Sequence, residues 1–134
     1  MFTDLPILAL IVAMAANMVL GFLWYGPLFG KQWGAASGVD MQNTDGGSPA
    51  MYAVPALGGL FAAIVLFNMM RAMGATDLMG GITTAFWAWL GFTAFSSLTN
   101  AMFRGSGTKL WTIESLAHLA GFALSGAILG LMAF

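Results

Sequence analysis

Glu114 and His118, four positions apart, have the greatest chemical potential in this sequence. On an α-helix that spacing places both side chains on one face. A neutral imidazole beside a carboxylate can hold or pass a proton, so the pair suggests a proton-linked or polar-substrate site. His118 is the only histidine and cysteine is absent. Zinc normally needs three or four protein ligands, so we expect no metal and no cofactor.

Enzymatic chemistry is not indicated by the remaining residues. The sequence has no phosphate-binding loop, no nucleophile elbow and no paired carboxylates within one apolar segment. A catalytic site would need a nucleophile or a metal set beside His118 and Glu114. We therefore expect a protein that is not an enzyme. A net charge of −1 without a basic run also argues against nucleic-acid binding.

The composition places these residues in a membrane. The 134 residues are 60% hydrophobic and 7% charged, with four basic and five acidic side chains. Soluble domains carry about 25% charged residues, and so few charges cannot cover a water-exposed surface. The sequence thus predicts an all-α integral membrane protein in which a single transmembrane domain spans residues 1–134.

Four segments are long and apolar enough to cross the roughly 30 Å hydrocarbon core of a bilayer. Short links after the second and third segments make their neighbours antiparallel hairpins, which predicts a four-helix bundle. Glu114, near one segment end, is the only formal charge within them. The predicted spans are residues 5–25, 51–70, 79–101 and 111–134.

The polar loop 27–50 is the only long link. Leu28, Phe29 and Trp33 beside Lys31 suggest a short helix lying in the membrane interface. The following GVDMQNTDGGSP sequence is typical of a flexible turn region. Interfacial aromatic residues are expected to anchor the ends of the helices. The candidate anchors are Trp24, Tyr25, Trp33 and Trp111.

Basic residues predict the orientation. Lys31, Arg104 and Lys109 lie in the first and third links, whereas Arg71 alone lies on the opposite side. Because cytoplasmic loops carry an excess of Lys and Arg, we expect both termini in the periplasm of a bacterium. The predicted location is therefore the inner membrane.

Several polar residues share one expected depth. Counting along each helix from its centre places them in the cytoplasmic half of the bilayer, on three or four helices. One interpretation is a polar site, because intramembrane polar groups often face a bundle interior or a water cavity. The other is that these groups only hydrogen-bond across helices, with Glu114 capping its helix. The residues concerned are Asn17, Ser96, Ser97, Asn100, Glu114 and His118.

Small residues at intervals of four predict close helix packing, with a partner helix in the same chain or another. The candidates are Gly58, Gly121, Ser125, Gly126 and Gly130. The tripeptide LGF occurs at residues 20–22 and 90–92, each time before aromatic residues, a basic residue and a tryptophan. This similarity suggests an internal duplication of two hairpins.

Three stretches carry a family resemblance: VLGFLWYGPLFGKQW (residues 19–33), GATDLMGGITTAFWAWLGF (residues 74–92) and SGAILG (residues 125–130). They resemble the bacterial membrane family described as domain of unknown function 1761. The resemblance covers nearly the whole chain and implies a small four-span protein, but no activity. Small multidrug resistance transporters resemble the chain in size only. They use a carboxylate deep in the first helix, where this sequence has Asn17.

Two functions remain open from the sequence. The leading hypothesis is a non-enzymatic membrane protein that self-associates as a homo-oligomer or serves as an accessory subunit of a membrane assembly. The alternative is a small transporter or channel that uses the polar layer. A transporter predicts a water-accessible cavity that reaches Asn17 and His118, whereas an accessory subunit predicts dry packing there. The bilayer itself is the only partner that both hypotheses require.

Overall fold

The computed structural model describes residues 2–38 and 49–134, and the regular elements within these ranges are all helices. Most of the polar turn region predicted after Ser37 lies outside the described residues. Two short π-helical turns, η1 and η2, interrupt the first and third apolar stretches. The elements are α1 (Ile7–Leu23), η1 (Trp24–Leu28), α2 (Gly30–Ser37), α3 (Ala50–Met73), α4 (Leu78–Trp89), η2 (Leu90–Ala94), α5 (Phe95–Arg104) and α6 (Thr108–Met132).

These elements form four stretches long and apolar enough to cross a membrane. Their observed bounds are Ile7–Leu28, Ala50–Met73, Leu78–Arg104 and Thr108–Met132. The predicted all-α fold with four spans is confirmed. A helix is also present after the first span, where the sequence predicted one: α2.

The helix ends follow from local chemistry. Asp77 precedes α4, and its Oδ1 accepts a hydrogen bond of 2.6 Å from the backbone N–H of Gly80. This contact satisfies one of the amide groups left unpaired at a helix start. Gly74 and Gly105 end α3 and α5 with φ angles of 69° and 68°. Glycine adopts such left-handed angles without steric cost, so the chain reverses within a few residues at both links.

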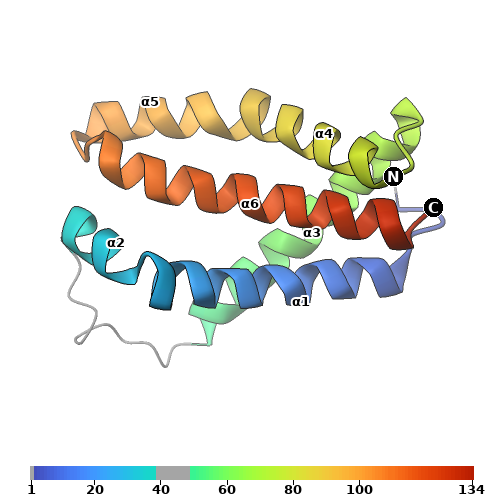
Figure 1. Ribbon diagram of the computed structural model, residues 1–134, viewed down its shortest axis with the longest axis horizontal. Coiled ribbons are helices and arrows are strands. Elements are labelled where there is room, and N and C mark those ends of the chain that lie inside the picture. The colour runs from blue at the N-terminus through green and yellow to red at the C-terminus, as the bar shows by residue number, and fades with distance from the viewer. Residues whose placement is uncertain (1, 39–48) are drawn as a thin grey trace.

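Figure 1 shows the spans packed side by side, with α3 crossing behind the others at an angle. Both termini and the α3–α4 link lie at one end of the bundle, here called the terminal end. The α5–α6 link and α2 lie at the opposite end, here called the loop end. The main interhelical contacts join α4 to α6 and α1 to both α3 and α6.

The closest helix contact joins α4 and α6. A Cβ added at Gly81 would collide with the backbone carbonyl of Gly126, and one added at Gly126 would collide with that of Gly81. Gly130 lies just as closely against the backbone of Asp77 and Leu78. The two backbones touch because Gly81, Gly126 and Gly130 carry no side chain that would hold them apart.

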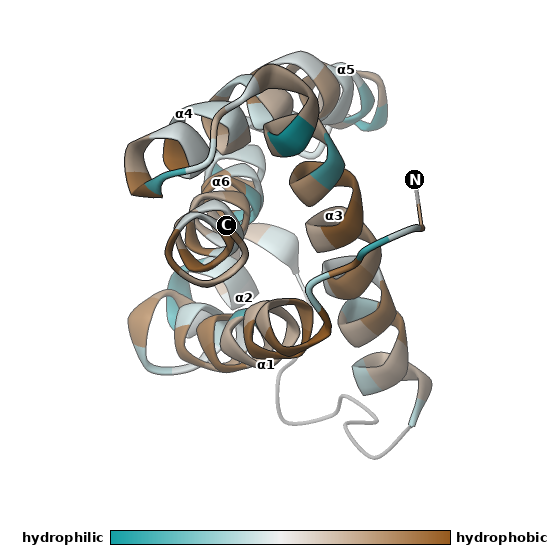
Figure 2. Ribbon diagram, turned by 90° about the vertical axis from the view of Figure 1, so that its right-hand side faces the viewer, coloured by the Kyte–Doolittle hydropathy of each residue, from teal (hydrophilic) through white to brown (hydrophobic). Residues whose placement is uncertain are grey.

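A dry hydrophobic core fills the terminal half of the bundle. Its members come from α1, α3, α4 and α6 and include Leu10, Ala63, Met70, Ala85 and Leu129. Figure 2 shows hydrophobic residues along the spans. Many large side chains on the outer surface are exposed apolar groups, as expected for helices surrounded by lipid. The polar side chains of interest must therefore lie nearer the loop end.

Candidate functional site

Two tryptophan indoles tie neighbouring helices to the first half of α6. Trp24 Nε1 donates a 3.0 Å hydrogen bond to the carbonyl oxygen of Ile113, and Trp89 Nε1 donates one of 3.0 Å to that of Ser115. Trp24 comes from η1, and Trp89 ends α4. Buried indole N–H groups need such acceptors. These bonds position the start of α6 against two other spans.

Two further indoles reach side chains at the loop end. Trp33 on α2 donates a 3.1 Å hydrogen bond to Glu114 Oε1, and its ring meets that of Tyr25 edge to face. Trp111 on α6 donates a 3.0 Å hydrogen bond to Ser97 Oγ. All four residues predicted as interface anchors therefore take part in contacts within the chain. Through Trp33, α2 holds the Glu114 carboxylate in place.

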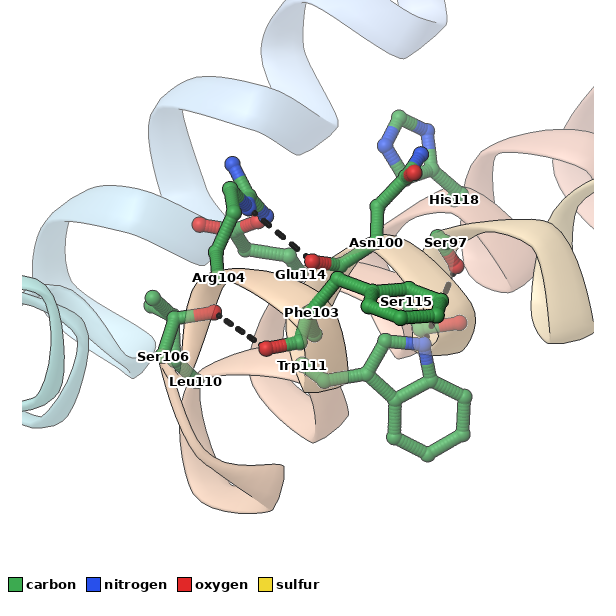
Figure 3. A pocket seen from close by; sticks show the side chains of 11 residues that line it. Ser97, Asn100, Phe103, Arg104, Ser106, Leu110, Trp111, Glu114, Ser115 and His118 are labelled. Atoms are coloured by element: carbon green, nitrogen blue, oxygen red, sulfur yellow. Dashed lines mark hydrogen bonds between the residues drawn. The ribbon is translucent and has the colours of Figure 1, made fainter.

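The start of α6 and the end of α5 enclose a cavity of about 280 Å³, here called the polar pocket. Figure 3 shows side chains from both helices of this hairpin lining it. Four predicted site residues, Ser97, Asn100, Glu114 and His118, line this one cavity. The full lining comprises Ser97, Asn100, Ala101, Phe103, Arg104, Ser106, Leu110, Trp111, Glu114, Ser115 and His118.

The two charged groups of the polar pocket retain binding capacity. Arg104 Nε donates a 3.3 Å hydrogen bond to the carbonyl oxygen of Asn100, and its terminal amino groups have no other partner among the described residues. Glu114 Oε1 accepts the hydrogen bond from Trp33, whereas the second carboxylate oxygen has no hydrogen-bond partner within the described ranges. The pocket thus offers one cationic and one anionic group to a ligand.

Ser115 is the polar residue of this pocket that the fold leaves unsatisfied. It is 2% exposed, and its Oγ has no hydrogen-bond partner in the part of the chain that the structure describes. Serine in a helix often bonds the carbonyl oxygen four residues before it, as Ser97 does with Thr93 at 2.6 Å. A buried hydroxyl without a partner costs free energy, and this oxygen has almost no accessible surface of its own.

A second cavity of about 500 Å³, the central hollow, lies between α1, α3, η2 and α6. Asn17, Tyr25, Thr93, His118 and Ser125 are the polar members of its mostly apolar lining. His118 lines both the central hollow and the polar pocket. The two cavities therefore have this residue in common.

Asn17 is held inside the bundle by two helices. Its Nδ2 donates hydrogen bonds of 2.9 Å to the carbonyl oxygen of Ala13 and 2.7 Å to Ser125 Oγ on α6. Gly121 faces the Asn17 side chain, where a Cβ would lie 2.5 Å from Oδ1. The amide both crosslinks α1 to α6 and borders the central hollow.

Some predicted residues lie apart from this arrangement. Ser96 is exposed, lines neither cavity and bonds the carbonyl oxygen of Phe92 on its own helical stretch at 3.0 Å. Gly58 borders the central hollow, with no atom within 4 Å of the position of an added Cβ. Gly126 and Gly130 contact α4 of the same chain.

Sequence reasoning missed Arg104 and Ser115 as members of the site. Arg104 contributed only to the arguments on orientation and duplication, although it lies four residues after Asn100 and shares a helix face with it. Ser115 lies three residues before His118, a spacing that also permits contact along one face. Its burial depends on the rotation of α6 against α4, which hydropathy does not report.

Metal ligands do not gather in the described residues: no group of three His, Cys, Asp or Glu side chains could hold an ion there. The polar pocket instead contains hydrogen-bond donors, acceptors and two opposite charges. Such a set can bind a polar ligand without forming a covalent bond to it.

Comparison with known proteins assigns the chain to a family. Residues 8–130 match the family model described as "Protein of unknown function (DUF1761)". The chain belongs to this family. No curated protein and no solved structure matches the sequence. Family membership thus adds no activity to what the cavities indicate.

Proposed function

We propose that this protein is a small, non-enzymatic membrane transporter that binds a polar group of its substrate at the loop end of the bundle. The observation that carries this proposal is that His118 lines both the polar pocket and the central hollow. Together they extend from the α5–α6 link to Asn17, near the middle of the first span. A tightly packed structural subunit would fill this region with side chains.

The polar pocket and the central hollow do not reach into the buried core of the terminal end. The dry core around Leu10, Ala63 and Leu129 lies beyond Asn17 and contains no room for a polar solute. A carrier that alternates between two sides has such a closed half in each state. We take the described conformation as the state open toward the loop end.

Binding rather than catalysis accounts for the groups in the polar pocket. Ser97 Oγ is engaged with Trp111 and with the backbone of Thr93, so it is not poised as a nucleophile. A proton-relaying dyad needs a carboxylate close to the imidazole, and His118 has none within 4 Å among the described residues. Hydrogen bonds and charge contacts are the chemistry that this set supports.

We further propose that the loop end faces the cytoplasm of a bacterium and that the protein resides in the inner membrane. Lys31, Arg104 and Lys109 lie at the loop end, and Arg71 lies near the terminal end. The excess of basic residues on cytoplasmic loops supports this orientation. The cavities would then open toward the cytoplasm.

Self-association has weaker support than transport. The glycine pair at Gly126 and Gly130 is buried against α4, so it is not available to a second copy. A homo-oligomer or an accessory role would need another surface of the bundle. We therefore place transport ahead of the accessory-subunit hypothesis.

Engineered cysteines test the transport proposal on a chain that has none of its own. Gly58 borders the central hollow, whereas its neighbour Leu57 is exposed on the outer surface at nearly the same depth. We expect a charged thiol reagent to modify Gly58→Cys on the order of tenfold faster than Leu57→Cys, because charged molecules do not enter hydrocarbon. Ala63→Cys, in the dry core of the same helix, should stay unmodified.

Applying the reagent to each face of proteoliposomes separates a carrier from a one-sided binding protein. A carrier exposes the same hollow to both sides in turn, so Gly58→Cys should react from the loop side and, more slowly, from the terminal side. Reaction from the loop side alone would refute transport. Equal rates for Gly58→Cys and Leu57→Cys would refute the water-filled hollow itself.

A further inference from the structure

A third cavity extends the polar site into an apolar groove that opens between α3 and α4. Two adjoining hollows of about 270 and 670 Å³ form this groove, and they share Met69, Ala88 and Phe92. The first of them also shares Ala62, Phe122 and Ser125 with the central hollow. The polar pocket, the central hollow and the apolar groove therefore form a series in which each cavity shares lining residues with the next.

This series changes in polarity along its length. The polar pocket contains Arg104, Glu114 and Ser115, whereas the groove is lined by methionine, alanine, glycine and aromatic side chains, with Thr83 and Thr84 at its far part. A small hydrophilic solute would use only the first part. A molecule with a polar head and an aliphatic chain matches both ends.

We propose that the ligand is a phospholipid with a primary ammonium in its head group, bound with the head in the polar pocket and an acyl chain along the central hollow and apolar groove. This inference rests on the proposed function, for which it names the substrate class. Phosphatidylethanolamine has this chemistry.

The head group matches the unsatisfied groups of the pocket. The phosphate accepts hydrogen bonds from the terminal amino groups of Arg104. The ammonium donates to the free oxygen of Glu114. The terminal amino groups of Arg104 and the second carboxylate oxygen of Glu114 have no other hydrogen-bond partner among the described residues. A choline head has no N–H to donate, and a glycerol head has no positive charge for Glu114.

The distance that the cavities cover along the third span matches the length of an acyl chain. Helices rise about 1.5 Å per residue, so the third span descends about 15 Å from Asn100 to Leu90. Half of a roughly 30 Å hydrocarbon core is the same distance. A chain that starts at the polar pocket thus passes Thr93 in the central hollow and reaches Phe92 and Ala88 where the groove begins.

The identity of the ligand is tested by how far each phospholipid protects the Gly58→Cys variant from modification by the charged thiol reagent. The protein is placed in vesicles of phosphatidylcholine alone, or of phosphatidylcholine mixed with either phosphatidylethanolamine or phosphatidylglycerol of matched chains. We expect phosphatidylethanolamine alone to slow modification by about tenfold, the effect of one charge-assisted hydrogen bond. Equal protection by phosphatidylglycerol, or none by either lipid, would overturn the proposal.

A double variant with Glu114→Gln controls for general effects of lipid composition. The amide oxygen still accepts from Trp33, but the negative charge opposite the ammonium is gone, so protection by phosphatidylethanolamine should disappear. Protection that persists would show that bilayer properties, not head-group binding, slow the reagent. The proposed function is tested separately, since it requires that Gly58→Cys reacts from both faces of vesicles that contain phosphatidylcholine alone.

Two more measurements test the acyl chain and whether the polar head belongs to a lipid or to a free solute. Gly91 lines the groove and has no atom within 4 Å of an added Cβ, so Gly91→Leu fills the groove without a clash. We expect it to abolish protection, whereas Ala53→Leu, exposed on α3 outside all three cavities, should retain it.

Soluble phosphoethanolamine should not protect the Gly58→Cys variant from the thiol reagent. Protection by it equal to that by the lipid would identify a free polar solute and refute the amphiphile.

Discussion

The buried hydroxyl of Ser115 has no hydrogen-bond partner among the described residues, which costs stability. Its neighbour Glu114 and the hydroxyl of Ser97 both have partners, whereas Ser115 Oγ has none among the residues described. Ser125 is almost equally buried, at 4% exposure, but accepts a hydrogen bond from Asn17. The two serines on α6 can therefore be compared directly, because both are buried but only Ser125 has a hydrogen-bond partner for its hydroxyl.

Alanine substitution should separate these two serines. In detergent without phospholipid, we expect Ser115→Ala to raise the free energy of unfolding by about 1 kcal/mol, because an unsatisfied buried group is removed. Ser125→Ala should lower it by about 0.6 kcal/mol, since an interhelical hydrogen bond is lost. Thermal or denaturant unfolding followed by circular dichroism measures both. A loss of stability in Ser115→Ala equal to that in Ser125→Ala would contradict the unpaired hydroxyl.

At the scale of helices, the contact between α4 and α6 organises the bundle. Gly81 and Gly126 meet backbone to backbone, and Asp77 starts α4 beside Gly130. This packing fixes the rotation of α6, which turns Ser115 inward and leaves His118 facing the cavities. The glycine spacing was visible in the sequence, but its partner helix was not, because the motif is the same for contacts within and between chains.

Substitution of glycine by leucine should distinguish packed from open positions. Gly126→Leu forces a side chain into the Gly81 backbone, so we expect a loss of several kcal/mol, or failure to fold, similar to that of overpacked cores. Gly91→Leu, in open space on η2, should remain within about 1 kcal/mol of the parent protein. Unfolding of both variants in dilute detergent measures the difference. Equal stability of the two variants would contradict the intrachain contact.

The two halves of the chain share an element pattern. Each half has an apolar helix that continues through a π-helical turn, η1 or η2, and is followed by an uninterrupted helix of 24 or 25 residues. π-helical turns are uncommon and often occur near functional sites. Here η1 supplies Trp24, and η2 supplies Thr93 to the central hollow. This pattern fits the duplication suggested by the two LGF tripeptides.

At the scale of the whole molecule, the polar pocket and the central hollow lie in the loop half of the bundle, whereas the terminal half contains the buried core, with the apolar groove between α3 and α4 beside it. Most of the basic residues lie at the loop end, and Arg71 near the terminal end donates a 3.2 Å hydrogen bond to the carbonyl oxygen of Thr3. This contact holds the chain start against α3. A polar ligand can therefore enter from one end in the described conformation.

Labelling of engineered cysteines should reveal which end of the bundle faces the cytoplasm. Thr76 lies in the α3–α4 link and Thr108 starts α6, so the two exposed residues are at opposite ends of the bundle. In intact bacterial cells, a membrane-impermeant thiol reagent should modify Thr76→Cys, and Thr108→Cys should react only after the inner membrane is opened, because basic loops remain in the cytoplasm. The reverse pattern would invert the proposed orientation.

The sequence by itself determined the class of protein, the four spans and the level at which polar residues gather, because hydropathy and helix rise act along the chain. It also indicated that Ser97, Asn100, Glu114 and His118 share one depth. Only the tertiary structure decided which of these side chains meet. The rotation and tilt of each helix depend on where small residues let backbones touch. For this reason Ser96 bonds its own helix, Ser115 turns inward, and the glycines of α6 contact α4.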